Sequence, residues 1–137
     1  MKDAQATVED FLNRFRRAWD AGDARTYAAL FTEDATYVIF MGEVIVGRAG
    51  IERNHVDVFN RWQRGTKMVV EATAIQSLGA DSLSVLTVGG VGRERPVRYD
   101  KIQTFTLVRQ DGRWLCAAFH NTAMSDRARS GFERRLG

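Results

Sequence analysis

The chain has 137 residues, a formal net charge of +3 and a hydrophobic content of 45%, which suits one domain with a buried core and a cavity. The adjacent arginines Arg16-Arg17 and Arg134-Arg135 are isolated pairs and not a basic patch, and no apolar stretch could cross a bilayer, so we expect neither a nucleic-acid nor a membrane partner. A single cysteine excludes a disulfide within the chain, and the first residues lack the apolar segment of a signal peptide. Both observations favour the cytoplasm.

Three helices are predicted in the first half of the chain. Apolar residues recur at spacings of three and four between residues 4 and 19, which indicates an amphipathic helix that ends at Gly22. Asp23 is a suitable N-cap for a short second helix that ends near Phe31. A third helix follows Gly50, and one of its faces carries Ile51, His55, Phe59 and Trp62.

The strands are predicted mainly in the second half. Residues 35–41 and 44–46 form a short hairpin before the third helix, and long runs rich in Val, Ile, Thr and aromatic residues follow at 66–78, 82–91, 97–110 and 114–122. Short turns separate these runs, so neighbouring strands should be antiparallel. Long twisted strands curl, and we therefore predict an α+β, cone-shaped fold: three N-terminal helices packed on a strongly curved, mostly antiparallel sheet that encloses a pocket.

The end of the chain differs in charge from the rest. We predict one domain over residues 1–124 and a basic tail over residues 125–137, in which four arginines face two acidic residues. The first interpretation of this tail is a solvated segment. A docked final helix and a contact with an anionic group are the alternatives.

The order of these elements resembles the nuclear-transport-factor-2-like, or SnoaL-like, superfamily. The segments that carry the resemblance are residues 18–24, 30–35, 47–59 and 111–122. The first two are typical of the opening of that fold, and the third resembles its last N-terminal helix. The final segment, from Asp111 to Thr122, resembles the SgcJ/EcaC branch of the superfamily.

This resemblance implies a deep apolar pocket and, often, a homodimer formed through the outer sheet face. Relatives include ketosteroid isomerases, polyketide cyclases, scytalone-type dehydratases, epoxide hydrolases and proteins that only bind; the SgcJ-like branch is associated with enediyne and other polyketide gene clusters. The chain has no Gly-x-Gly-x-x-Gly motif and no ligand-spaced metal cluster, so we expect no cofactor and no metal. It also departs from a ketosteroid-isomerase pattern, because only Asp100 resembles a mid-strand acid in an apolar setting.

Three residues are the candidates for catalysis. His55 lies on the apolar face of the third helix and is suited to general acid or base work, or else it is a core histidine bonded to a backbone carbonyl. Tyr37 offers a phenol to a ligand oxygen, or is simple core. His120 and Asn121 are adjacent on a strand and face opposite ways unless a bulge intervenes, and we expect His120 inside.

Other residues are candidates for substrate binding. Asp100 and Thr104 share a strand face, and we expect that face to be inward because Lys101 and Arg109 fall on the other. In the alternative orientation of this strand, the pocket is lined instead by Tyr99, Gln103, Phe105 and Leu107. Asn121, which is adjacent to His120 on the last strand, is a further candidate. Aromatic residues at core-like spacings complete the predicted walls, namely Trp19, Phe40, Phe59 and Trp62.

Two functions from different classes fit these residues. The leading hypothesis is an enzyme of natural-product metabolism that cyclises, isomerises or dehydrates a hydrophobic, polyketide-like or enediyne-like substrate, with His55 as the proton shuttle and Tyr37, Asn121 or His120 polarising a carbonyl. The rival is a carrier protein that hands over an apolar intermediate unchanged, which the scarcity of carboxylates in the predicted pocket favours. A rate that changes between pH 5 and 8 would indicate the enzyme, and a pH-insensitive affinity would indicate the carrier.

Overall fold

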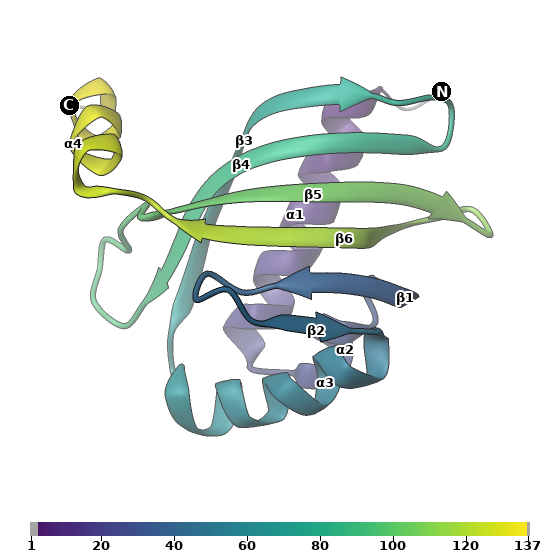
Figure 1. The fold of residues 1–137 in the computed structure, drawn as a ribbon, viewed down its shortest axis with the longest axis horizontal. Helices are drawn as coiled ribbons and strands as arrows, with labels where there is room; N and C mark the ends of the chain where they lie inside the picture. The colour runs from purple at the N-terminus through teal and green to yellow at the C-terminus, as the bar shows by residue number, and fades with distance from the viewer. Residues whose placement is uncertain (1–2, 137) are drawn as a thin grey trace.

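The computed structural model describes residues 3–136, and in it one curled sheet of six strands carries helices on one side (Figure 1). The elements are α1 (Ala4–Ala21), α2 (Ala24–Ala28), β1 (Phe31–Val38), β2 (Val44–Val46), α3 (Arg48–Asp57), the π-helical turn η1 (Val58–Trp62), β3 (Lys67–Ser77), β4 (Ser82–Gly92), β5 (Lys101–Gln110), β6 (Arg113–Ala123) and α4 (Asp126–Leu136). The strand order is β2-β1-β6-β5-β4-β3, and only β1 and β6 run parallel. The predicted α+β class and mostly antiparallel sheet are therefore confirmed.

The predicted helix ends are formed by capping groups. The Asp3 carboxylate accepts a hydrogen bond of 2.7 Å from the Ala6 amide at the start of α1, and Gly22 ends that helix with a φ of +65°. Asp23 caps α2 as predicted, but this helix stops at Ala28, because the chain must already be extended where Phe31 enters the sheet. The short α2 places the Tyr27 side chain in the core.

The core fills the space between α1 and the concave face of the sheet. Phe15, from the middle of α1, meets the rings of Phe105 and Tyr27 at centroid distances of 5.0 Å and that of Phe119 at 5.9 Å. Edge-to-face and tilted contacts of this kind add to the stabilisation from burial. This aromatic cluster packs α1 and α2 against the sheet, and Phe15, Tyr27 and Phe119 also form part of a cavity wall.

A β-bulge in β6 decides which of its side chains face inward. Cys116 pairs with Leu107 and Ala118 with Thr106, so Ala117 has no partner on β5. The extra residue shifts the alternation, and Phe119 and Asn121 therefore turn to the concave side while His120 turns outward. The expectation of an inward His120 was wrong for this reason.

The last eleven described residues form a helix rather than the solvated tail that was the first interpretation. Helix α4 follows β6 and stands beyond the ends of the strands, shown in yellow in Figure 1. It contacts the loop before β5: the rings of Phe132 and Tyr99 lie 5.5 Å apart, and Arg98 reaches Glu133 at 3.5 Å. The docked helix, the first of the two alternatives, describes this segment better. The boundary between a domain of residues 1–124 and this segment remains a prediction.

Candidate functional site

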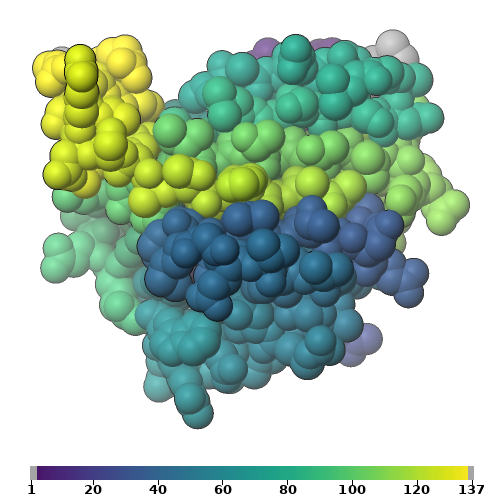
Figure 2. All heavy atoms as spheres, viewed as in Figure 1, coloured from purple at the N-terminus to yellow at the C-terminus, as the bar shows by residue number. Residues whose placement is uncertain are grey.

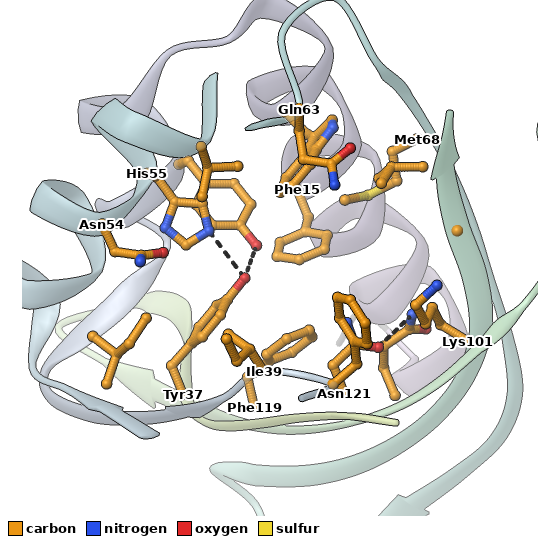
Figure 3. Close-up of a pocket in the computed structure, with 18 of the residues that line it drawn as sticks. Phe15, Tyr37, Ile39, Asn54, His55, Gln63, Met68, Lys101, Phe119 and Asn121 are labelled. Atoms are coloured by element: carbon orange, nitrogen blue, oxygen red, sulfur yellow. Dashed lines mark hydrogen bonds between the residues drawn. The ribbon is translucent and has the colours of Figure 1, made fainter. Parts of the chain in front are cut away.

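A cavity of about 570 Å³ opens between the concave face of the sheet and helices α1 and α3. Figure 3 shows side chains from both halves of the chain converging on it. Its volume lies in the range of small-molecule sites. Residues that line it include Phe15, Trp19, Tyr27, Tyr37, Ile39, Phe40, His55, Val58, Trp62, Met68, Lys101, Gln103, Phe119 and Asn121.

A hydrogen-bonded chain of Tyr27 from α2, Tyr37 from β1 and His55 from α3 lines one wall of this cavity. This wall is called the helical wall because it lies on the side of α2 and α3. The hydroxyls of Tyr27 and Tyr37 are 2.7 Å apart, and the Tyr37 oxygen lies 3.1 Å from His55 Nε2 (Figure 3). His55 Nδ1 lies 2.7 Å from the carbonyl oxygen of Ile51, one turn earlier on α3. Because a carbonyl only accepts, Nδ1 carries the proton. In neutral His55, Nε2 is then an acceptor, so Tyr37 donates to Nε2 and Tyr27 donates to Tyr37.

Burial keeps this chain uncharged. His55 is 2% exposed, and loss of hydration lowers its pKa to about 4, although the hydrogen bond to Ile51 opposes the shift. Burial also raises the pKa of the Tyr27 and Tyr37 hydroxyls well above the usual value for tyrosine. At neutral pH the site therefore presents a neutral imidazole and two neutral phenols.

A second set of hydrogen-bonded side chains, Thr87, Gln103 and Asn121, lies on the opposite wall of the cavity. The sheet forms this wall, which is called the sheet wall. Thr87 Oγ1 lies 2.6 Å from Gln103 Oε1, and Gln103 Nε2 lies 3.2 Å from Asn121 Oδ1. Thr87 is fully buried and Gln103 is 7% exposed. Sequence reasoning identified Asn121, and it placed Gln103 in the pocket only in the alternative orientation of that strand. It missed Thr87, because a single polar residue within a strand is ordinarily one that faces solvent.

The predicted aromatic walls are placed in three ways. Trp19 lines the cavity, and its indole Nε1 donates to Thr66 Oγ1 at 3.0 Å. Phe59 lies behind the lining and packs its ring 5.0 Å from that of Trp19 and 5.7 Å from that of His55. Phe40 and Trp62 stand at the mouth, 45% and 61% exposed. Of the four aromatic residues predicted to line the cavity, Trp19, Phe40 and Trp62 line it, and Phe59 packs behind the lining.

Asp100, Thr104 and His120 do not line the cavity, contrary to expectation. Thr104 pairs with His120 across the outer sheet face, where both are exposed. The prediction relied on Lys101 facing solvent, but Lys101 lines the cavity and its ammonium reaches Asp100 Oδ1 at 2.9 Å. A lysine can thus occupy an inward position when its charge is paired with a carboxylate.

Two further findings concern metals and membranes. Within residues 3–136, no three His, Cys, Asp or Glu side chains gather closely enough to hold a metal ion. No helix in the described part of the chain is both long and apolar enough to span a membrane.

Cys116 is a buried residue of β6, and burial raises the pKa of its thiol to about 12, so the thiol is protonated at neutral pH.

Comparison with known proteins places the chain. A family model described as a SnoaL-like domain matches residues 3–120. No curated protein sequence matches at a significant level. Among solved structures, a domain of unknown function with a cystatin-like fold from Nostoc punctiforme has a TM-score of 0.82 at 21% identity, covering 99% of this chain and 87% of its own.

Two other solved structures carry family names. A nuclear-transport-factor-2-like protein of unknown function from Shewanella oneidensis has a TM-score of 0.76 at 15% identity, covering 88% of this chain and 99% of its own. A ketosteroid isomerase-like protein from Erwinia carotovora atroseptica has a TM-score of 0.70 at 17% identity, covering 91% and 99%. Identities this low show a shared fold alone. Since the family model spans most of the sequence, however, the chain belongs to the SnoaL-like domain family.

Proposed function

We propose that the protein is an acid–base enzyme that isomerises, cyclises or dehydrates a hydrophobic small molecule, with His55 accepting a substrate proton through Tyr37. The observation that carries this proposal is the Tyr27–Tyr37–His55 chain, which ends at the wall of an aromatic cavity. A buried imidazole whose Nε2 carries no proton can act as a base at neutral pH, and the Tyr37 hydroxyl connects it to the space that a ligand would occupy.

The proton transfer follows from the polarity of that chain. A substrate C–H or O–H would give its proton to the Tyr37 oxygen as the Tyr37 hydroxyl proton moves to His55 Nε2. The resulting imidazolium keeps its Nδ1–H bonded to the Ile51 carbonyl. With a pKa of about 4, holding this proton at pH 7 costs about 4 kcal/mol, so His55 would return it quickly. Short-lived storage suits isomerisation or dehydration, in which the same proton is delivered to another atom of the substrate.

The substrate class and setting extend this proposal. We propose a polyketide-like or enediyne-like substrate in cytoplasmic natural-product biosynthesis, supported by the resemblance of residues 111–122 to the SgcJ/EcaC branch and by the apolar and aromatic lining. Of the three groups considered for polarising a carbonyl, Asn121 is favoured. His120 is outside, and the proton of Tyr37 is already donated to His55.

The test begins with the natural ligand. The protein is incubated with an extract of the organism that makes it, and native mass spectrometry identifies a retained mass. We expect that compound to be converted by the wild-type protein and by His120→Gln, and its turnover to fall at least about 100-fold in His55→Gln with binding retained. Unchanged turnover in His55→Gln would remove the proposed role of this residue.

The low pKa of His55 also changes the expected pH profile. A rate limited by this base should be constant between pH 6 and 8 and should fall only below about pH 5, as the imidazole binds a proton. The window of pH 5 to 8 predicted from an ordinary histidine no longer separates enzyme from carrier. Chemical conversion of the ligand separates them instead.

A carrier remains the second candidate, and one observation favours it. Every proton of the Tyr27–Tyr37–His55 chain is already engaged within the protein, and burial opposes the addition of another. Such a site could bind a ligand without reacting with it. Recovery of the retained compound with its mass and isomeric form unchanged would support the carrier over the enzyme.

We also propose a homodimer formed through the outer sheet face. Leu86 and Val46 lie on that face with 42% and 67% of their side chains exposed. Figure 2 shows the strands of this face uncovered, with α4 standing at one edge. Sedimentation should therefore give a dimer for the wild-type protein and a monomer for Leu86→Glu. A monomeric wild-type protein would overturn the proposal.

A further inference from the structure

The hydrogen-bond distances along the sheet wall set the orientation of two amides. The separation of 2.6 Å between Thr87 Oγ1 and Gln103 Oε1 is typical of an O–H donor and short for an N–H donor. Thr87 therefore donates its hydroxyl proton to the Gln103 oxygen. Gln103 must then use its NH₂ group toward Asn121 Oδ1, at the N–H···O distance of 3.2 Å.

This order leaves one kind of group for a ligand. The oxygen of Asn121 is occupied by Gln103, and its NH₂ group donates to no acceptor among residues 3–136. Asn121 lines the cavity, so the sheet wall presents a hydrogen-bond donor. Reversing both amides would present an acceptor, but it would place an N–H at the 2.6 Å contact and leave the Thr87 hydroxyl with only a backbone carbonyl 3.5 Å away.

The helical wall has the opposite polarity. His55 Nδ1–H donates to Ile51, Tyr37 donates to His55, and Tyr27 donates to Tyr37, so no proton of this chain is free. What remains are lone pairs on the two phenol oxygens, which accept hydrogen bonds. In Figure 3 the side chains of Ile39 and Phe119 lie between Tyr37 and Asn121, so the floor of the cavity between these two residues is apolar.

We infer that the cavity recognises an apolar molecule with a carbonyl oxygen at one end, directed to the Asn121 NH₂, and a hydroxyl group at the other, directed to Tyr37. Thr87 and Gln103 are positioning residues that fix the polarity of Asn121; Thr87 lies behind the cavity lining, and both polar groups of the Gln103 side chain are already engaged by Thr87 and Asn121. This inference rests on the proposed small-molecule function and narrows its ligand to the class of hydroxy-ketones. It does not depend on whether the ligand is converted.

Two matched pairs of naphthalenes test each wall separately. β-Acetylnaphthalene and β-isopropylnaphthalene have nearly the same shape, but only the first offers a carbonyl. β-Naphthol and β-methylnaphthalene differ in the same way by a hydroxyl donor. We expect the acetyl and hydroxyl compounds to bind about fivefold more tightly than their apolar partners, measured by fluorescence titration of the wild-type protein.

Substitutions then assign each preference to its wall. Thr87→Val and Asn121→Leu should abolish or reverse the acetyl preference, because the carbonyl loses water without gaining a donor, and both should leave the hydroxyl preference intact. Thr87→Ser, which keeps the hydroxyl, should retain both preferences. Thr104→Val is the matched control, because it makes the same threonine-to-valine change on the exposed outer face of the neighbouring strand. It should change neither the acetyl preference nor the hydroxyl preference.

The possible outcomes separate the two levels of the proposal. If none of the four naphthalenes binds, the small-molecule function and the inference both fail. If they bind but the acetyl compound has no advantage, or Thr87→Val leaves that advantage unchanged, the inference alone is overturned and the pocket stands. An acetyl preference that is lost in Thr87→Val and kept in Thr87→Ser and Thr104→Val supports it.

Discussion

Replacing Tyr37 by phenylalanine should lower the free energy of unfolding by about 3 kcal/mol, although it removes a single oxygen atom. The Tyr37 hydroxyl accepts from Tyr27 and donates to His55, so its loss leaves a buried donor and a buried acceptor without partners. Each such group costs about 1–3 kcal/mol. Urea denaturation at pH 7 gives the difference directly.

The matched control is Tyr27→Phe. Tyr27 is equally buried, but its hydroxyl is the first donor of the chain, and removing it leaves Tyr37 still bonded to His55. We expect this variant to lose about 1 kcal/mol. Equal losses in the two variants would show that the direction of donation along the chain is not as assigned.

Acidification should destabilise the folded protein through His55 by about 3 kcal/mol between pH 7 and pH 4. Burial holds the pKa of His55 at about 4 in the folded protein, against 6.5 for an ordinary histidine. Below pH 6.5 the unfolded chain binds a proton that the folded protein does not, so proton binding lowers the free energy of the unfolded state relative to the folded state. The contribution to stability is complete above pH 6.5 and is lost as the pH falls toward 4.

The measurement compares urea denaturation of the wild-type protein and His55→Gln at pH 7, 5.5 and 4. Carboxylates contribute alike to both proteins, so the difference between the two curves isolates the histidine. The wild-type protein should lose about 3 kcal/mol more than the variant over this range. His120→Gln, which removes an exposed histidine from the outer face, is the control. A parallel fall in wild-type and His55→Gln proteins would contradict the account.

Two residues of the helical wall, His55 and Tyr37, were predictable from the periodicity of the sequence, whereas Tyr27 was not among the predicted site residues. A stripe with spacings of three and four places His55 beside Ile51 and Phe59, and a helix of that length has one buried face whatever its exact ends. Tyr37 follows from the alternation of a short strand. The family resemblance and the cone-shaped fold rest on the same long-range pattern, which tolerates errors of one or two residues at each end.

The sheet wall was less predictable, because a period of two fails when one residue is added. The bulge at Ala117 reverses the faces of everything after it, so His120 and Asn121 exchanged the places expected for them. On β5, the charge of Lys101 suggested an outward face, but Lys101 lines the cavity and its ammonium pairs with Asp100. Gln103 was predicted to line the pocket only in the alternative orientation of β5, and Thr87 was not predicted at all, since its role depends on a hydrogen bond to a neighbouring strand.

The most direct test of the central claim is the protonation state of His55, measured by long-range nitrogen–proton NMR of the imidazole rings. The Tyr27–Tyr37–His55 chain requires the proton on Nδ1, a bare Nε2 between pH 5.5 and 8, and uptake of a second proton only near pH 4. That result would establish a neutral base bonded to Tyr37 at the cavity wall. A proton on Nε2, or titration near pH 6.5, would contradict both the direction of the hydrogen bonds and the base proposed from it.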